Sequence, residues 1–62
     1  MSKLRTLRES RGWSRFVLGV KSGMNPASIY LIETGKRKPN LETAYKLANA
    51  FCLPVEEVFP NE

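Results

Sequence analysis

The chain has 62 residues, enough for one small domain spanning residues 1–62. Its 42% hydrophobic and 26% charged residues are typical of a globular chain rather than a disordered one. His and Asp are absent and Cys52 is the only cysteine, which excludes Cys/His zinc sites, Ser-His-Asp catalysis and an intrachain disulfide. We therefore expect a cytoplasmic protein that is not an enzyme, has no cofactor or metal, and does not enter a membrane, since its apolar runs are short.

The charge is strongly uneven along the chain. The formal net charge is +4 and the isoelectric point about 9.7, in the range typical of nucleic-acid-binding domains. Residues 1–38 carry nine Lys and Arg against two Glu, whereas residues 39–62 carry one Lys against four Glu. The basic part is expected to face an anionic partner, and a solvated basic surface is the alternative.

Local signals predict five short helices and no strands. In chain order, we expect helices from Lys3 to Arg11, Arg15 to Ser22, Pro26 to Glu33, Leu41 to Phe51 and Val55 to Phe59. The N-caps are expected at Ser14, Asn25 and Asn40, and the breaks at Gly12, Gly23 and Gly35. The fourth helix has apolar residues spaced as one buried face, namely Leu41, Ala44, Tyr45, Leu47, Ala48 and Phe51. The fold class is therefore all-α, a compact bundle of five helices.

The second and third helices are spaced as a helix-turn-helix over about residues 15–34. Gly19 allows the next helix to approach closely, Gly23 permits a left-handed turn, and Ile29 fixes one helix on the other. The second helix of such a unit fits the major groove of DNA.

Motifs along nearly the whole chain resemble a known family. These are Arg5-x-x-Arg8-x-x-Arg11-Gly12-Trp13-Ser14, then Gly23, then Ile29-x-x-Ile32-Glu33-x-Gly35-Lys36-Arg37-x-Pro39, then Leu41-Glu42-Thr43-Ala44-x-x-Leu47-Ala48. The chain resembles the phage-repressor (Cro/cI-type, xenobiotic-response-element) family. The resemblance implies a lambda-repressor-like domain that binds double-stranded operator DNA, usually as a homodimer, and regulates transcription, most often as a repressor.

The resemblance also implies which residues touch DNA. The expected phosphate contacts are Arg15, where the family usually has Gln, and the basic loop with its cap, Lys36, Arg37, Lys38 and Asn40. The alternative for the residues of the basic loop and its cap is that they are only solvated and contact no phosphate. The expected base contacts lie on the exposed face of the third helix, Asn25, Pro26, Ala27, Ser28, Tyr30 and Leu31. Pro26 and Ala27 offer no side-chain hydrogen bond, so we expect thymine-methyl contacts, modest specificity and much indirect readout.

The resemblance gives three further expectations. Arg8 and Glu33 are expected to pair across helices, with two separately solvated charges as the alternative. Cys52 stands where relatives commonly have a left-handed Gly. The C-terminal apolar residues Leu53, Val55, Val58 and Phe59 resemble a dimerisation segment, and a lid on the core explains them equally well.

The second helix carries unusual apolar residues. Phe16, Val17 and Val20 occupy positions that relatives generally fill with polar residues. They form either an exposed patch for a protein partner or a contact with Trp13 and the first helix. The patch favours an alternative function, a protein-interaction module on the same fold (antitoxin-like or a co-regulator) with weak DNA specificity.

Overall fold

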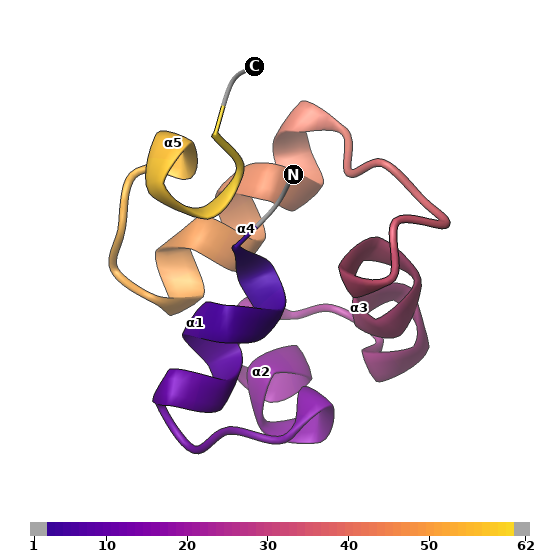
Figure 1. The fold of residues 1–62 in the computed structure, drawn as a ribbon, viewed down its shortest axis with the longest axis vertical. Coiled ribbons are helices and arrows are strands. Elements are labelled where there is room, and N and C mark those ends of the chain that lie inside the picture. The colour runs from indigo at the N-terminus through magenta and orange to yellow at the C-terminus, as the bar shows by residue number, and fades with distance from the viewer. Residues whose placement is uncertain (1–2, 61–62) are drawn as a thin grey trace.

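The computed structural model describes residues 3–60, which form five α-helices and no strand (Figure 1). The helices are α1 (Leu4–Ser10), α2 (Arg15–Ser22), α3 (Pro26–Glu33), α4 (Leu41–Ala50) and α5 (Val55–Val58). The all-α expectation is confirmed, and each helix begins and ends within one residue of its predicted limits. Within residues 3–60, no helix has the length and apolar character needed to cross a membrane.

Side-chain caps start three of the helices, as predicted. The oxygen of Ser14 accepts a hydrogen bond from the backbone N–H of Val17 at 3.1 Å. Asn25 and Asn40 do the same for α3 and α4, each over 2.8 Å. Each cap satisfies one backbone donor that has no partner inside its helix. Short polar residues therefore fix where these helices begin.

A tight turn joins α2 to α3. Gly23 has a φ of 73° and donates its N–H to the carbonyl of Gly19 at 2.8 Å. A Cβ atom on Gly19 would lie 2.6 Å from the carbonyl oxygen of Met24, so only glycine fits this position without a shift. The two glycines thus set the close approach of α3 to α2, as the sequence predicts.

Apolar residues from all five helices form one core. Its buried members are Leu4, Leu18, Ile29, Ile32, Leu47, Ala48, Phe51 and Val58. Helix α2 packs against α3 and α4, and α4 packs against α5. The backbone N–H of Lys3 donates to the carbonyl of Val58 at 2.9 Å, which ties the start of α1 to α5. Helix α3 is left on one side of the molecule, away from α5 (Figure 1).

The prediction for α4 was wrong at two residues. Ala44 and Leu47 are buried, but Leu41 is 68% and Tyr45 52% exposed. Successive helical residues are about 100° apart, so Tyr45 is rotated well away from the buried stripe. Leu41 lies in the first turn, where the spacing alone does not say whether another element covers it. The buried face of α4 is therefore narrower than its apolar spacing indicates.

Arg11 caps the other end of α4. One of its terminal nitrogens donates to the carbonyl of Phe51 at 3.1 Å, and its guanidinium lies over the rings of Trp13 and Phe51. The two rings stack with centroids 5.1 Å apart. Because α4 has no basic residue in its last turn, Arg11 supplies the positive charge that favours a helix C-terminus. This contact fixes the α1–α2 connection against the core.

Candidate nucleic-acid interface

The outward face of α3 is apolar at its centre. Ile29 and Ile32 are buried, and at about 100° per residue Ala27 and Leu31 lie on the opposite side of the helix. Ala27 is exposed and Leu31 half-buried. Tyr30, 43% exposed, lies toward one flank of this face. Apart from the Tyr30 hydroxyl, this face of α3 therefore presents methyl groups.

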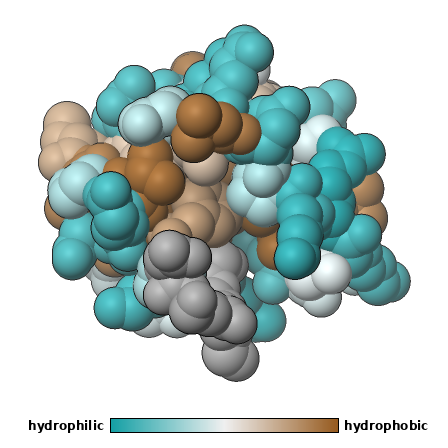
Figure 2. Space-filling view, turned by 90° about the horizontal axis from the view of Figure 1, so that it is seen from above, coloured by the Kyte–Doolittle hydropathy of each residue, from teal (hydrophilic) through white to brown (hydrophobic). Residues whose placement is uncertain are grey.

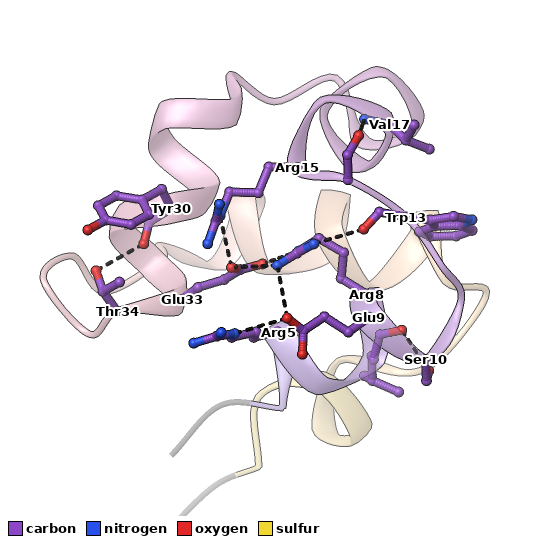
Figure 3. Close-up of polar contacts among 12 residues, drawn as sticks. Arg5, Arg8, Glu9, Ser10, Trp13, Arg15, Val17, Tyr30, Glu33 and Thr34 are labelled. Atoms are coloured by element: carbon purple, nitrogen blue, oxygen red, sulfur yellow. Dashed lines mark hydrogen bonds and ion pairs between the residues drawn. The ribbon is translucent and has the colours of Figure 1, made fainter.

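An arginine from α2 lies against the flank of α3 that carries Tyr30. The guanidinium carbon of Arg15 is 5.1 Å from the centre of the Tyr30 ring. The Nε–H of Arg15 donates to Oε1 of Glu33 at 3.1 Å. Tyr30 and Glu33 are three residues apart on α3, so one guanidinium reaches both (Figure 3).

Glu33 is the centre of a network that holds α1, α2 and α3 together. Its side chain is 1% exposed and accepts from the Nε–H of Arg8 at 2.6 Å, as well as from Arg15. Arg8 also donates from its terminal nitrogens to Glu33 and to the carbonyl of Trp13. The hydrogen bond to Glu33 raises the pKa of Arg8, so this guanidinium stays charged at any physiological pH. The structure thus brings the expected pair together and adds Arg15 to it (Figure 3).

The basic loop contacts the other flank of α3. A terminal nitrogen of Arg37 donates to the hydroxyl of Ser28 at 3.1 Å. Lys36 and Lys38 are exposed beside it, and so is Asn40, whose side-chain oxygen caps α4. The loop returns to α3 through its backbone, since the N–H groups of Lys36 and Arg37 donate to the carbonyl of Leu31 at 2.9 and 3.1 Å. Helix α3 is therefore bordered by Arg15 on one side and Arg37 on the other.

Not every expected base-contacting residue is equally placed. Asn25 is exposed, and because its oxygen caps α3, the amide nitrogen is the donor that remains for a ligand. Pro26 is half-buried, and its ring lies close to Gly19 of α2. Ser28 is half-buried and already bonded to Arg37. Of the expected base-contacting residues, the most accessible are Asn25, Ala27 and Tyr30.

The apolar positions of α2 are mostly exposed. Phe16 is 68% and Val20 69% exposed, whereas Val17 is half-buried. The alternative in which these side chains pack against Trp13 and α1 is therefore wrong for Phe16 and Val20. Leu18, which lies between them in the chain, is fully buried in the core.

The C-terminal apolar residues pack on the chain's own core. Val58 is fully buried in the core of a single chain. It therefore has no surface for a second subunit, which corrects the expectation that it lies in a dimer interface. Leu53, Val55 and Phe59 are half-buried against that core, and part of each side chain remains accessible. Figure 2, which looks onto the α4 and α5 end, shows hydrophobic residues toward α5 and hydrophilic residues toward α3.

Cys52 follows α4 with a φ of 57° and is exposed. This is the left-handed conformation expected at that position, and a side chain there costs roughly 1 kcal/mol relative to glycine. Among residues 3–60, Cys52 is the only residue other than glycine with a positive φ.

Contacts of three arginines were not predicted from the sequence. Arg15 was expected to contact a phosphate, and its contacts with Glu33 and Tyr30 were not expected. The contacts of Arg37 with Ser28 and of Arg11 with the end of α4 were not foreseen either. The sequence could have predicted only the contacts of Arg15. Tyr30 and Glu33 are three residues apart on one helix, so a cation that pairs with Glu33 also lies close to the Tyr30 ring.

Comparison with known proteins agrees with this geometry. The helix-turn-helix family model, of the Cro/cI type, matches residues 4–58. The relatives are named as uncharacterized HTH-type transcriptional regulators. One from Archaeoglobus fulgidus is 33% identical over 58 residues, covering 94% of this chain and 83% of that protein. Another, YgzD of Bacillus subtilis, is 34% identical over 58 residues, covering 94% and 88%.

Longer proteins carry the same domain. A relative from Mycobacterium tuberculosis is 39% identical over 51 residues, which are 82% of this chain and 20% of that protein. The chain thus matches about a fifth of the length of the mycobacterial relatives and most of the length of the archaeal and Bacillus ones. With a family match over almost all of its described residues and the α2–turn–α3 geometry in place, the chain belongs to the Cro/cI-type helix-turn-helix family of DNA-binding transcriptional regulators.

Proposed function

We propose that the protein is a sequence-specific repressor that binds operator DNA as a homodimer, with α3 in the major groove. The observation that carries the proposal is the setting of α3. Its exposed face is bordered by Arg15 against Tyr30 on one flank and Arg37 against Ser28 on the other. An α-helix fits the major groove, and the sugar-phosphate backbones lie along both edges of that groove. Cations on both flanks of the helix match this arrangement.

Affinity comes mainly from the basic loop and Arg15. Lys36, Arg37 and Lys38 are exposed next to α3, where a DNA strand would pass. Each phosphate neutralised releases counterions, so the logarithm of affinity falls with the logarithm of salt concentration by about 0.9 per contact. Binding by this surface is therefore strongly salt-dependent.

Base recognition by α3 is modest and favours thymine. Ala27 and Leu31 can contact thymine methyl groups, while the amide of Asn25 and the hydroxyl of Tyr30 supply the polar contacts. With few donors on the face, the shape and deformability of the operator contribute a large share of the discrimination.

The size of the domain supports a dimer. Its Cα atoms extend over 27 × 23 × 19 Å, whereas half-sites on one face of DNA are about 34 Å apart. One copy therefore covers one half-site, and two copies are needed for a palindromic operator. The accessible parts of Leu53, Val55 and Phe59 at the α5 end, away from α3, are the apolar surface we assign to the second subunit. A bound dimer then blocks polymerase sterically.

A selection from random 30-base-pair duplexes at about 150 mM salt tests the proposal. Enriched inverted half-sites about one helical turn apart are expected. The variant Lys36→Ala/Arg37→Ala is expected to lower the slope of log affinity against log salt by about 2 per protomer, measured by fluorescence anisotropy. Lys46→Ala, which removes an exposed cation paired with Glu42 on α4, is the matched control with an unchanged slope. Retention without enrichment contradicts sequence-specific binding.

One observation favours a second candidate function. Phe16 and Val20 are both exposed and lie one turn apart on α2, which suits a protein-interaction module on the same fold. Phe16→Ser separates the two functions. A DNA-binding repressor keeps its operator affinity in Phe16→Ser. An interaction module loses its function in Phe16→Ser and keeps it in Lys36→Ala/Arg37→Ala.

A further inference from the structure

We propose that Arg15 is a positioning residue for base recognition, which acts by holding Tyr30 in place on α3 while its own charge faces a DNA phosphate. The proposal rests on the proposed DNA-binding function. It goes further by naming the two residues of this chain that couple phosphate contact to base preference.

Arg15 is held in one orientation by a buried partner. Its Nε–H donates to Glu33 at 3.1 Å, and Glu33 is 1% exposed and fixed in turn by Arg8 at 2.6 Å. That bond uses the Nε edge of the guanidinium and leaves the two terminal nitrogens directed elsewhere. The Arg15 side chain is 37% exposed, so these nitrogens can meet a phosphate, which a guanidinium binds in a bidentate manner.

Tyr30 is covered on one face by that same guanidinium. The 5.1 Å between the guanidinium carbon and the ring centre is within the range of cation–π attraction. A tyrosine has only two side-chain torsions, so a cation over one ring face favours the orientations that keep this contact. Figure 3 shows the Tyr30 hydroxyl directed away from Arg15 and Glu33, on the outer side of α3. With 43% of Tyr30 exposed, its ring edge and hydroxyl are accessible to a ligand on the side away from Arg15.

Lysine at position 15 separates charge from geometry. It keeps the positive charge and can still contact a phosphate, but its single ammonium group cannot lie over Tyr30, donate to Glu33 and meet a phosphate at the same time, as the guanidinium can. If Arg15 serves only as a phosphate contact, lysine preserves base preference. If Arg15 positions Tyr30, lysine alters the preference at the base position that Tyr30 reads.

The experiment compares selected base profiles of four proteins, the wild type, Arg15→Lys, Tyr30→Leu and the double variant. In Arg15→Lys we expect an unchanged salt slope and a loss of about fivefold in preference at one position of each half-site, the size of a weak base contact. Tyr30→Leu is expected to lose preference at that same position, and the double variant to match Tyr30→Leu because the two residues act as a unit. Arg5→Lys, in an exposed pair with Glu9 on α1, is the matched control with the wild-type profile.

The possible failures are distinct from one another. A wild-type base profile in Arg15→Lys, or a double variant whose losses multiply, refutes the coupling while leaving the proposed function standing. If the wild type enriches no sequence, the proposed function fails and the coupling with it. Thermal unfolding of each variant reports whether a change in profile reflects a change in fold.

Discussion

Replacing Arg8 by methionine tests how much the buried charge network contributes to the fold. Arg8 is 8% exposed and donates to Glu33 through two nitrogens and to the carbonyl of Trp13 through a third. Methionine keeps most of the apolar length but removes the charge and all of these donors. Glu33, whose side chain is 1% exposed, is then left with Arg15 as its only partner among the described residues.

The expected loss of stability is large for a domain of this size. Removing one partner of a buried pair costs roughly 3–5 kcal/mol of stability. Because Glu33 keeps its hydrogen bond from Arg15, we expect Arg8→Met to lie at the lower end, at about 3 kcal/mol. A chain of this length is stable by about 3–9 kcal/mol in total. At roughly 4–8 °C per kcal/mol, the midpoint of thermal unfolding falls by about 12–24 °C.

Circular dichroism during heating measures this change. Arg5→Met is the matched control, because Arg5 and Glu9 form an exposed pair on the same helix with side chains 65% and 55% exposed. That pair contributes at most about 0.5 kcal/mol. Arg8→Met combined with Glu33→Met is expected to be more stable than Arg8→Met alone, since no buried charge is left unpaired. If the midpoint of thermal unfolding of Arg8→Met falls by less than about 4 °C, the reasoning is refuted.

Three other substitutions have expected effects on thermal unfolding. Gly19→Ala places a Cβ atom 2.6 Å from the carbonyl oxygen of Met24, so it destabilises the domain by about 1–3 kcal/mol; an unchanged midpoint contradicts this. Cys52→Gly relieves the left-handed conformation and raises stability by up to about 1 kcal/mol, whereas Cys52→Ala does not. Arg11→Ala removes the cap on the Phe51 carbonyl and costs about 1 kcal/mol; Trp13 fluorescence follows the same unfolding.

The helices were predictable because their limits are set by local chemistry. Ser14, Asn25 and Asn40 cap the following backbone with their own side chains, and the contact that decides each boundary lies within three residues. The glycine at position 23 likewise acts through its own φ of 73°. The close approach at Gly19 followed from the glycine spacing in the same way. Information of this kind is present in a short window of sequence.

Contacts between elements were less predictable. Leu41 fits the apolar spacing of α4, but its 68% exposure depends on which neighbouring helix covers that side. Arg15 presented a similar difficulty, because its pairing with Glu33 joins residues 18 apart in the chain. Phe16 and Val20 could be assigned to either side until the position of α1 was known. In each case the deciding partner lies on a different helix.

The composition of the α3 face has a consequence for how the protein would distinguish DNA sequences in the proposed complex. At its centre Ala27 and Leu31 offer only apolar contacts, so the polar discrimination must come from the edges of the face. There, Arg15 lies over the Tyr30 ring and Arg37 is bonded to Ser28, and both arginines are residues that we propose as phosphate contacts. Base contacts at these edges therefore depend on where the backbones lie, because a change in groove width moves the phosphates and the arginines that bind them. In the proposed complex, direct and indirect readout are thus coupled at both flanks of α3, and an operator with the right bases but a different groove width is expected to bind more weakly.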